Sequence, residues 1–269
     1  MIEQRVAGIN FARRGTGEPL LLIHGIGHRW QAWEPVLDAL AERHDVIAID
    51  LPGFGKSPRP IGGMPPSVPA LSTKLRSFLA ELGVDRPHVA GNSLGGGLAL
   101  ELAAAGIARS ATALSPAGFA TRAEALRALG ILIELRATTF LPAAAIRRIV
   151  TSPAGRRISV GMIVAKPSDL SPERTLGDAL AMRRGRGFIA MARALRGYEF
   201  AGAPTAPVTI AWGDHDRILI PRQATRAEQR LPLATHVGLA GCGHVPMSDD
   251  PDLVVATILA ATSAAVRPA

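Results

Sequence analysis

The 269-residue sequence has little cysteine, few aromatic residues and no long apolar run. Its single cysteine, Cys242, excludes an intramolecular disulfide and suits a reducing compartment. Nucleic-acid platforms interleave basic and aromatic side chains, so one tyrosine and 4% aromatic residues predict no nucleic-acid partner. No segment of about 18 consecutive apolar residues is present, which predicts that the chain does not span a membrane.

We also expect no export signal at the N-terminus. Met1 to Arg5 do not show the basic segment followed by an apolar segment that is typical of signal peptides. We therefore expect a cytoplasmic protein. Hydrophobic residues make up 48% of the chain and charged residues 19%, a composition typical of an ordered globular protein.

The net charge of +8 is concentrated in one third of the chain. Residues 118–204 hold 14 Lys and Arg against 6 Asp and Glu, whereas the remaining residues hold 16 of each. A solvated, arginine-rich helical surface would explain this excess. The same charge would also attract an anionic substrate or a membrane surface, so peripheral membrane contact through this segment is a second interpretation.

Strand-like and helix-like segments alternate in both terminal parts of the chain. Strands are predicted at 3–13, 19–24, 46–49, 87–91, 111–114, 208–212 and 235–239, and helices at 31–42, 70–83, 94–105, 222–230 and 251–265. Strands that alternate with helices predict an α/β fold, with a mostly parallel central sheet and helices on both faces.

The alternation stops after Gly118. Residues 121–200 are helix-like almost throughout, with loops predicted at 152–156, 166–173 and 184–187. We therefore expect three parts: an N-terminal part of the core (1–117), a helical lid inserted into it (118–204), and the C-terminal part of the core (205–269). We call residues 118–204 the insertion.

A serine stands at the junction of a predicted strand and a predicted helix. The junction is the pentapeptide Gly91-Asn92-Ser93-Leu94-Gly95. Glycine at both ends suits a turn so tight that side chains there would collide. Ser93 is then expected in a strained, exposed position at a helix N-terminus, where free N–H groups stabilise negative charge. This arrangement is typical of the nucleophile in serine-dependent acyl transfer.

A serine hydroxyl becomes a nucleophile when a base, normally a histidine oriented by a carboxylate, removes its proton. In parallel sheets such groups gather just beyond the carboxyl ends of the strands. Asp216 follows the predicted strand 208–212, and His244 follows the predicted strand 235–239. The chain order Ser93, Asp216, His244 predicts a catalytic triad.

These motifs resemble those of the α/β-hydrolase fold family, and the resemblance covers nearly the whole chain. The matching segments are Leu22-Ile23-His24-Gly25, the loop Asp50–Ser57, the elbow Gly91–Gly96, the acid loop Trp212–Asp216 and the histidine loop Gly243–Pro246. The resemblance implies the α/β-hydrolase fold with a helical lid. It is to the serine-nucleophile branch of carboxylesterases and lipase-like enzymes.

The resemblance also implies roles for backbone groups. By position, the N–H groups of Ile26 and Leu94 would form the oxyanion hole, and His24 and Gly25 would support the loop that carries Ile26. The family's spacing favours Asp216 as the acid over Asp214, which we expect to stabilise a turn. The chemistry requires no metal or cofactor, and the expected partner is a small, hydrophobic acyl substrate.

The fold hosts many reactions, so several functions stay open. Our first hypothesis is hydrolysis of a hydrophobic carboxylic ester or thioester through an acyl-enzyme. A Gly-Asn-Ser elbow also resembles carbon–carbon bond hydrolases of meta-cleavage products, which are vinylogous diketone acids, but Val245 stands where those enzymes usually have tryptophan. Cofactor-free perhydrolases or haloperoxidases, and a ligand-binding protein without catalysis, are further alternatives. The sequence does not predict the oligomeric state.

Three further features allow two interpretations each. The apolar stretches Leu129–Ile133 and Thr139–Pro142 either pack the insertion on the core or line an acyl pocket. His28 faces either the substrate or solvent. Cys242 is either a small packed residue or, if His244 lowers its pKa, an oxidation-sensitive thiol.

Overall fold

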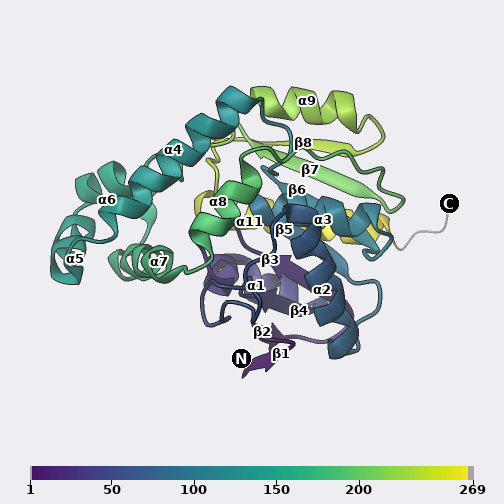
Figure 1. Cartoon of the computed structure of the whole chain (residues 1–269). Helices are drawn as coiled ribbons and strands as arrows, with labels where there is room; N and C mark the ends of the chain where they lie inside the picture. The colour runs from purple at the N-terminus through teal and green to yellow at the C-terminus, as the bar shows by residue number, and fades with distance from the viewer. Residues whose placement is uncertain (1, 266–269) are drawn as a thin grey trace.

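The computed structural model describes residues 2–265, which form an α/β fold around one eight-stranded sheet (Figure 1). The strand order is β1-β2-β4-β3-β5-β6-β7-β8; β2 pairs antiparallel with both β1 and β4, and the other neighbouring strands pair parallel. The strands are β1 (Ile2–Val6), β2 (Ile9–Arg14), β3 (Glu18–Ile23), β4 (His44–Ile49), β5 (His88–Asn92), β6 (Ser110–Leu114), β7 (Val208–Gly213) and β8 (Thr235–Leu239). The predicted α/β-hydrolase fold class is confirmed.

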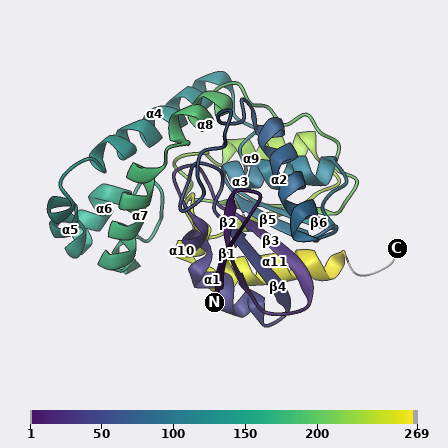
Figure 2. The same cartoon turned by 60° about the horizontal axis from the view of Figure 1, so that its bottom comes forward.

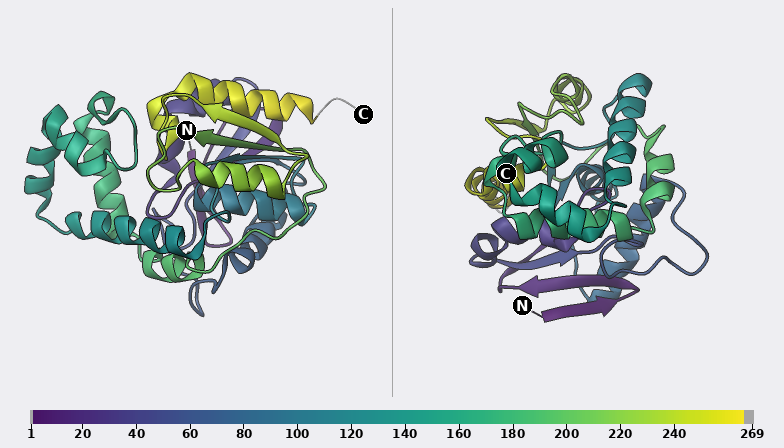
Figure 3. Two further views of the ribbon diagram at one scale, coloured as in Figure 1. Left: turned by 90° about the horizontal axis from the view of Figure 1, so that it is seen from above. Right: turned by 90° about the vertical axis from the view of Figure 1, so that its left-hand side faces the viewer.

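The central strands carry continuous apolar runs because both faces of the sheet are covered. In β3, Leu20 and Leu22 pack on one face, and Leu21 and Ile23 pack on the other. The first face is covered by α1 (Glu34–Ala41) and α11 (Pro251–Ala264), and the second by α2 (Val68–Leu82), α3 (Leu94–Ala104) and α9 (Arg222–Arg230) (Figure 3). Short helices η1 (Trp30–Trp33) and α10 (Pro246–Asp249) complete the core.

The predicted single strand over 3–13 is wrong, because this segment is a hairpin of β1 and β2. Ala7 and Gly8 form its two-residue turn, with φ angles of 51° and 75°. A two-residue hairpin turn of this kind requires positive φ at both positions, and glycine meets that requirement at one of them. The turn is hidden in the sequence because alanine, rather than asparagine, aspartate or glycine, precedes Gly8.

Five α-helices of the insertion lie between β6 and β7 and extend to one side of the sheet (Figures 1 and 2). They are α4 (Arg122–Thr138), α5 (Ala143–Thr151), α6 (Pro153–Val160), α7 (Pro172–Arg184) and α8 (Phe188–Leu195), with the 3-10 turn η2 (Pro167–Asp169) before α7. A capping box of Thr121 and Glu124 begins α4. The chain then bends by 109° between α4 and α5, within the apolar stretch 139–142.

The loop predicted at 152–156 is wrong. Ser152 accepts a hydrogen bond from Gly155 N–H, and Pro153 is the first residue of α6. Serine at the N-cap followed by proline is a helix start, so the residues that resembled a loop instead begin a helix.

Two arginines of the insertion donate hydrogen bonds to backbone carbonyls inside the protein. Arg156 is 6% exposed and donates to the carbonyls of Val150, Thr151 and Ser168. Arg136 donates to carbonyls of the α7 C-terminus, and its guanidinium lies over the Phe140 and Phe188 rings. Part of the positive charge therefore holds the helices of the insertion together.

Within residues 2–265, no single helix combines the length and apolar character needed to cross a bilayer. The bent pair α4 and α5 meets that requirement only when the two helices are taken together.

Candidate active site

Ser93 occupies a strained turn between β5 and α3. Its φ and ψ are 58° and −115°, a region that non-glycine residues rarely adopt. A Cβ on Gly91 would lie 2.0 Å from Gly95 O, and a Cβ on Gly95 would lie 2.0 Å from Ile23 O. Both positions therefore admit only glycine, which explains the spacing of the pentapeptide.

The insertion covers this turn. Ser93 is 6% exposed, whereas the sequence predicts an exposed serine. The difference arises because Gly118, at the start of the insertion, and Leu195 and Tyr198, near its end, line the same small cavity as Ser93.

Asp216 and His244 form a buried pair. His244 Nδ1 lies 2.8 Å from Asp216 Oδ2, and the two side chains are 5% and 0% exposed. The other carboxylate oxygen, Oδ1, accepts hydrogen bonds from the N–H groups of Ile218 and Leu219. Because Nδ1 donates to the carboxylate, the imidazole presents Nε2 to a further partner.

Asn92 connects this pair to the serine turn. Its side-chain amide donates to the carbonyls of Leu114 and His244, the latter at 2.8 Å. The residue before Ser93 is therefore bonded directly to the backbone of His244. Within residues 2–265, no hydrogen bond joins the Ser93 hydroxyl to His244. Such bonds are often long in unliganded sites and shorten when substrate binds.

His24 stabilises the loop that lies against Ser93. Burial lowers the pKa of His24 to about 3, so the ring is neutral. Its Nδ1 donates to Gly25 O at 2.6 Å, and its Nε2 accepts from Leu51 N–H at 2.9 Å. A Cβ on Gly25 would lie 3.2 Å from Ser93 Cβ, and Ile26 lines the same cavity as Ser93.

Residues 20–257 match the Alpha/beta hydrolase family. The chain belongs to this family. It is an enzyme of the hydrolase class, as the sequence predicts.

Three similar proteins illustrate the range of the family. An uncharacterized protein of Mycobacterium tuberculosis is 30% identical over 263 residues, which cover 90% of this chain and 74% of that protein. The structure of a bacterial membrane phospholipase A, 25% identical, gives a TM-score of 0.74 and covers 97% of this chain and 84% of that one. The 2-hydroxy-6-oxo-6-phenylhexa-2,4-dienoate hydrolase of Rhodococcus sp. strain RHA1 gives 0.77 over 97% and 98% of the two chains, at 19% identity, which shows a shared fold.

The cavity that Ser93 lines in this alpha/beta hydrolase is small and uncharged. Its volume is about 40 Å³, and none of its lining residues is Asp, Glu, Lys, Arg or His. The Tyr198 hydroxyl donates to Glu101 at 2.9 Å. The lining residues are Ile26, Ser93, Ala117, Gly118, Ala120, Ala125, Ala128, Leu129, Leu132, Leu195, Tyr198, Ile218 and Leu219.

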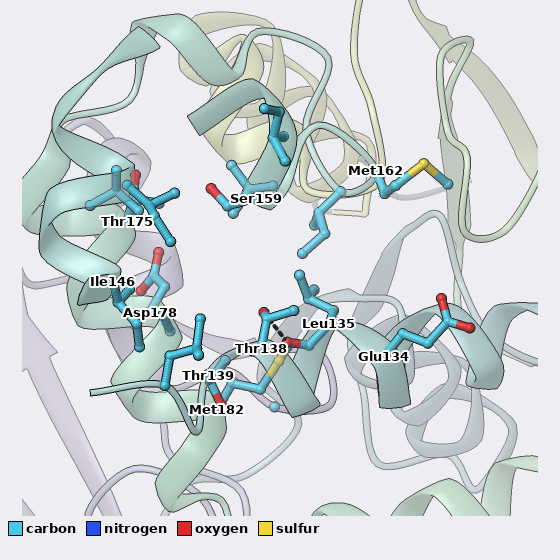
Figure 4. A pocket seen from close by; sticks show the side chains of 18 of the residues that line it. Glu134, Leu135, Thr138, Thr139, Ile146, Ser159, Met162, Thr175, Asp178 and Met182 are labelled. Carbon is cyan, nitrogen blue, oxygen red and sulfur yellow. Dashed lines mark hydrogen bonds between the residues drawn. The ribbon is translucent and has the colours of Figure 1, made fainter. Parts of the chain in front are cut away.

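A second, larger cavity of about 360 Å³ lies among the helices of the insertion (Figure 4). Gly27 and His28, which directly follow Ile26, are the residues that the core contributes to its lining. The two apolar stretches of the insertion are therefore divided: Leu129 lines the small cavity, and Ile131, Thr139 and Leu141 line the large one.

Other residues near the site have structural roles. Asp214 accepts from Gly241 N–H at 2.8 Å and from His215 at 2.7 Å, so it stabilises a turn, as we expected from the sequence. Cys242 is fully buried, and burial raises its pKa to about 11. The packed interpretation of Cys242 therefore holds, and the oxidation-sensitive one is wrong. Among residues 2–265, no group of three or more His, Cys, Asp or Glu is placed to hold a metal ion.

Two residues that the sequence does not single out have clear roles in the structure. Asp249 binds the backbone of the His244 loop and of the insertion, and Asn92 binds the carbonyl of His244. Asn92 lies within the pentapeptide Gly91–Gly95, so the motif that identifies Ser93 also indicates that this position is important. Asp249 stands among other acidic residues, and no local pattern distinguishes it.

Proposed function

We propose that this hydrolase cleaves a hydrophobic carboxylic ester or thioester through an acyl-enzyme on Ser93. The observation that carries this proposal is the buried Asp216–His244 pair, which Asn92 ties to the strained turn holding Ser93. A buried carboxylate that orients a histidine beside a serine on such a turn is the arrangement that activates a hydroxyl.

In the proposed reaction, His244 Nε2 takes the proton of Ser93 Oγ as this oxygen attacks the carbonyl carbon. The N–H groups of Ile26 and Leu94 hold the oxyanion, and loss of one such donor typically costs about 10²–10³ in rate. His24 and Gly25 keep the loop that carries Ile26 against Ser93. Protonated His244, stabilised by Asp216, then gives its proton to the leaving alcohol or thiol. Water hydrolyses the acyl-enzyme by the same route.

The linings of both cavities favour a neutral ester over a meta-cleavage product. That substrate is a carboxylate and would need a cation, but none of the residues lining either cavity is Lys or Arg. The phospholipase A structure, an ester hydrolase by its name, supports cleavage of an ester over that of a carbon–carbon bond. At 19% identity, the likeness to the dienoate hydrolase shows a shared fold and not a shared substrate.

The test is turnover of p-nitrophenyl esters of increasing acyl length by the wild type and by Ser93→Ala. We expect kcat to fall by at least about 10³-fold in Ser93→Ala, with an unchanged circular dichroism spectrum. Wild-type-like turnover in the variant would refute the proposal. Adding hydrogen peroxide as the acyl acceptor distinguishes a perhydrolase, which would form the peracid in preference to the acid.

A further inference from the structure

The large cavity has an apolar wall built by four helices of the insertion. Isoleucine, leucine, valine and methionine side chains from α4, α5, α6 and α7 dominate its surface. The volume of about 360 Å³ lies within the range of small-molecule binding sites. The cavity at Ser93, about 40 Å³, has room for only a few water-sized groups. An acyl or alcohol chain of several carbons therefore fits the large cavity and not the small one.

The outer part of the large cavity is open and apolar. Ile158 is 85% exposed, and Leu141, Ile149 and Met162 are also exposed although they line the cavity. Apolar side chains left in water around a concave opening are typical of a ligand entrance.

The inner part of the cavity touches the loop beside Ser93. Gly27 has a φ of 81°, and a Cβ at this position would lie 3.0 Å from Met182 Cε. Met182 and Gly27 both line the cavity, so its inner end reaches the loop that carries Ile26. His28 is partly buried here, its Nδ1 has no partner within residues 2–265, and burial lowers its pKa. A chain in the cavity thus ends next to the loop proposed to hold the oxyanion.

The charged groups of the cavity indicate which chains it accepts. Two carboxylates, Glu134 and Asp178, line it, and Figure 4 shows both beside the apolar side chains. Neither an arginine nor a lysine is among the lining residues. Glu134 is exposed to solvent, whereas Asp178 is partly buried and lies 3.9 Å from Arg174. An anionic group would leave water for a largely apolar lining that offers it no lysine or arginine, which disfavours it.

We propose that the large cavity binds the long apolar limb of a neutral substrate, with its entrance at Ile158 and Met162 and its inner end at Gly27 and His28. This inference rests on the proposed function and names the substrate class as a neutral ester or thioester with a medium or long alkyl chain. The reacting carbonyl then lies beside Ser93, past the loop that joins the two sites: Ile26 lines the cavity at Ser93, and the adjacent Gly27 and His28 line the large one.

Ala179→Phe tests this inference, because Ala179 lines the cavity and phenylalanine would fill part of it. The matched control is Ala137→Phe, since Ala137 is exposed on α4 and does not line the cavity. We expect kcat/KM for p-nitrophenyl decanoate to fall at least about tenfold in Ala179→Phe, while that for the acetate stays within about twofold. Ala137→Phe should leave both unchanged. An equal fall for both esters, or none, would overturn the inference.

A binding measurement separates failure of this inference from failure of the proposed function. Nile red fluorescence in the presence of Ser93→Ala reports an apolar site without turnover. We expect 1-decanol to displace the dye, decanoate to displace it far less well, and Ala179→Phe, but not Ala137→Phe, to abolish binding. If this pattern holds while no ester is hydrolysed, the site stands and the proposed reaction fails. Equal displacement by decanol and decanoate would overturn the neutral substrate class.

Discussion

The carboxylate of Asp249 accepts a hydrogen bond from Gly243 N–H at 2.7 Å. Its other oxygen accepts from the N–H groups of Ala165 and Lys166, each at 2.8 Å. A single buried side chain thus joins the residue before His244 to the insertion. The His244 N–H itself donates to Ile163 O at 2.8 Å. Two independent sets of hydrogen bonds therefore join the His244 loop to the insertion.

Asp249→Asn should impair catalysis as well as stability. Asparagine offers one acceptor oxygen to three N–H groups, and an unpaired buried donor costs about 1–3 kcal/mol in the free energy of unfolding. Because the His244 loop loses a support, we expect kcat to fall at least about tenfold with little change in KM. Urea unfolding and steady-state kinetics with a short ester measure the two effects.

The control for that variant is Asp252→Asn, which changes an exposed aspartate in the first turn of α11. It should leave kcat as in the wild type. If Asp249→Asn lowers stability but not kcat, Asp249 supports the fold alone and does not position His244.

Two glycine-to-alanine substitutions should have opposite effects on stability. The added methyl group of Gly95→Ala would lie 2.0 Å from the backbone carbonyl of Ile23, so we expect no folded, active protein. Gly130, within α4, has open space around its Cα, and Gly130→Ala should raise the free energy of unfolding by about 0.5–1 kcal/mol. Thermal unfolding measures both, and a folded Gly95→Ala protein would contradict the steric argument.

His24 should make the protein less stable as the pH falls. Its pKa is about 3 in the folded protein, against an ordinary value of 6.5. Between these values the unfolded chain binds a proton that the folded protein does not, so stability rises with pH across this window. The contribution is about 1.4 kcal/mol per pH unit below 6.5. Urea unfolding at pH 7 and pH 5.5 should show a smaller loss for His24→Gln than for the wild type, and equal losses would contradict this assignment.

Cys242 should react slowly with thiol reagents in the folded protein. It is fully buried, and its pKa of about 11 leaves almost no thiolate at neutral pH. We expect one equivalent of Ellman's reagent to react in denaturant and essentially none within minutes under native conditions. Rapid native labelling would show that the surrounding loop opens readily.

The sequence predicts the parts of the fold that depend on local patterns. The buried strands follow from continuous apolar runs, and the Ser93 turn follows from glycines that no other residue can replace. The hairpin turn at Ala7 and Gly8 is missed because Ala-Gly lacks the asparagine, aspartate or glycine that usually occupies the first position of such a turn. The start of α6 is missed because serine and proline are common in loops and at helix starts alike.

Long-range contacts lie beyond such patterns. Asp249 accepts a hydrogen bond from the N–H group of Lys166, 83 positions away in the chain. No residue next to either of them in the sequence indicates this contact. The cavity among the insertion helices also depends on long-range contacts. Its lining depends on how α4 to α7 cross one another, whereas the sequence indicates only that their apolar stretches are buried.

The insertion leaves the sheet after Leu114 and returns at Val208, yet β6 and β7 are direct neighbours, with Leu114 opposite Ala211. The pairing of β6 with β7 therefore does not depend on the intervening helices. A segment of different length can be exchanged for residues 118–204 with the strand register kept intact. Such a chimera must still supply a backbone carbonyl for the His244 N–H and two N–H groups for Asp249. We infer that substrate range and bond cleavage can be engineered separately, provided that the new segment also keeps the other hydrogen bonds of residues 118–204 to the core, such as Tyr198 to Glu101 and Gly187 N–H to Gly53 O.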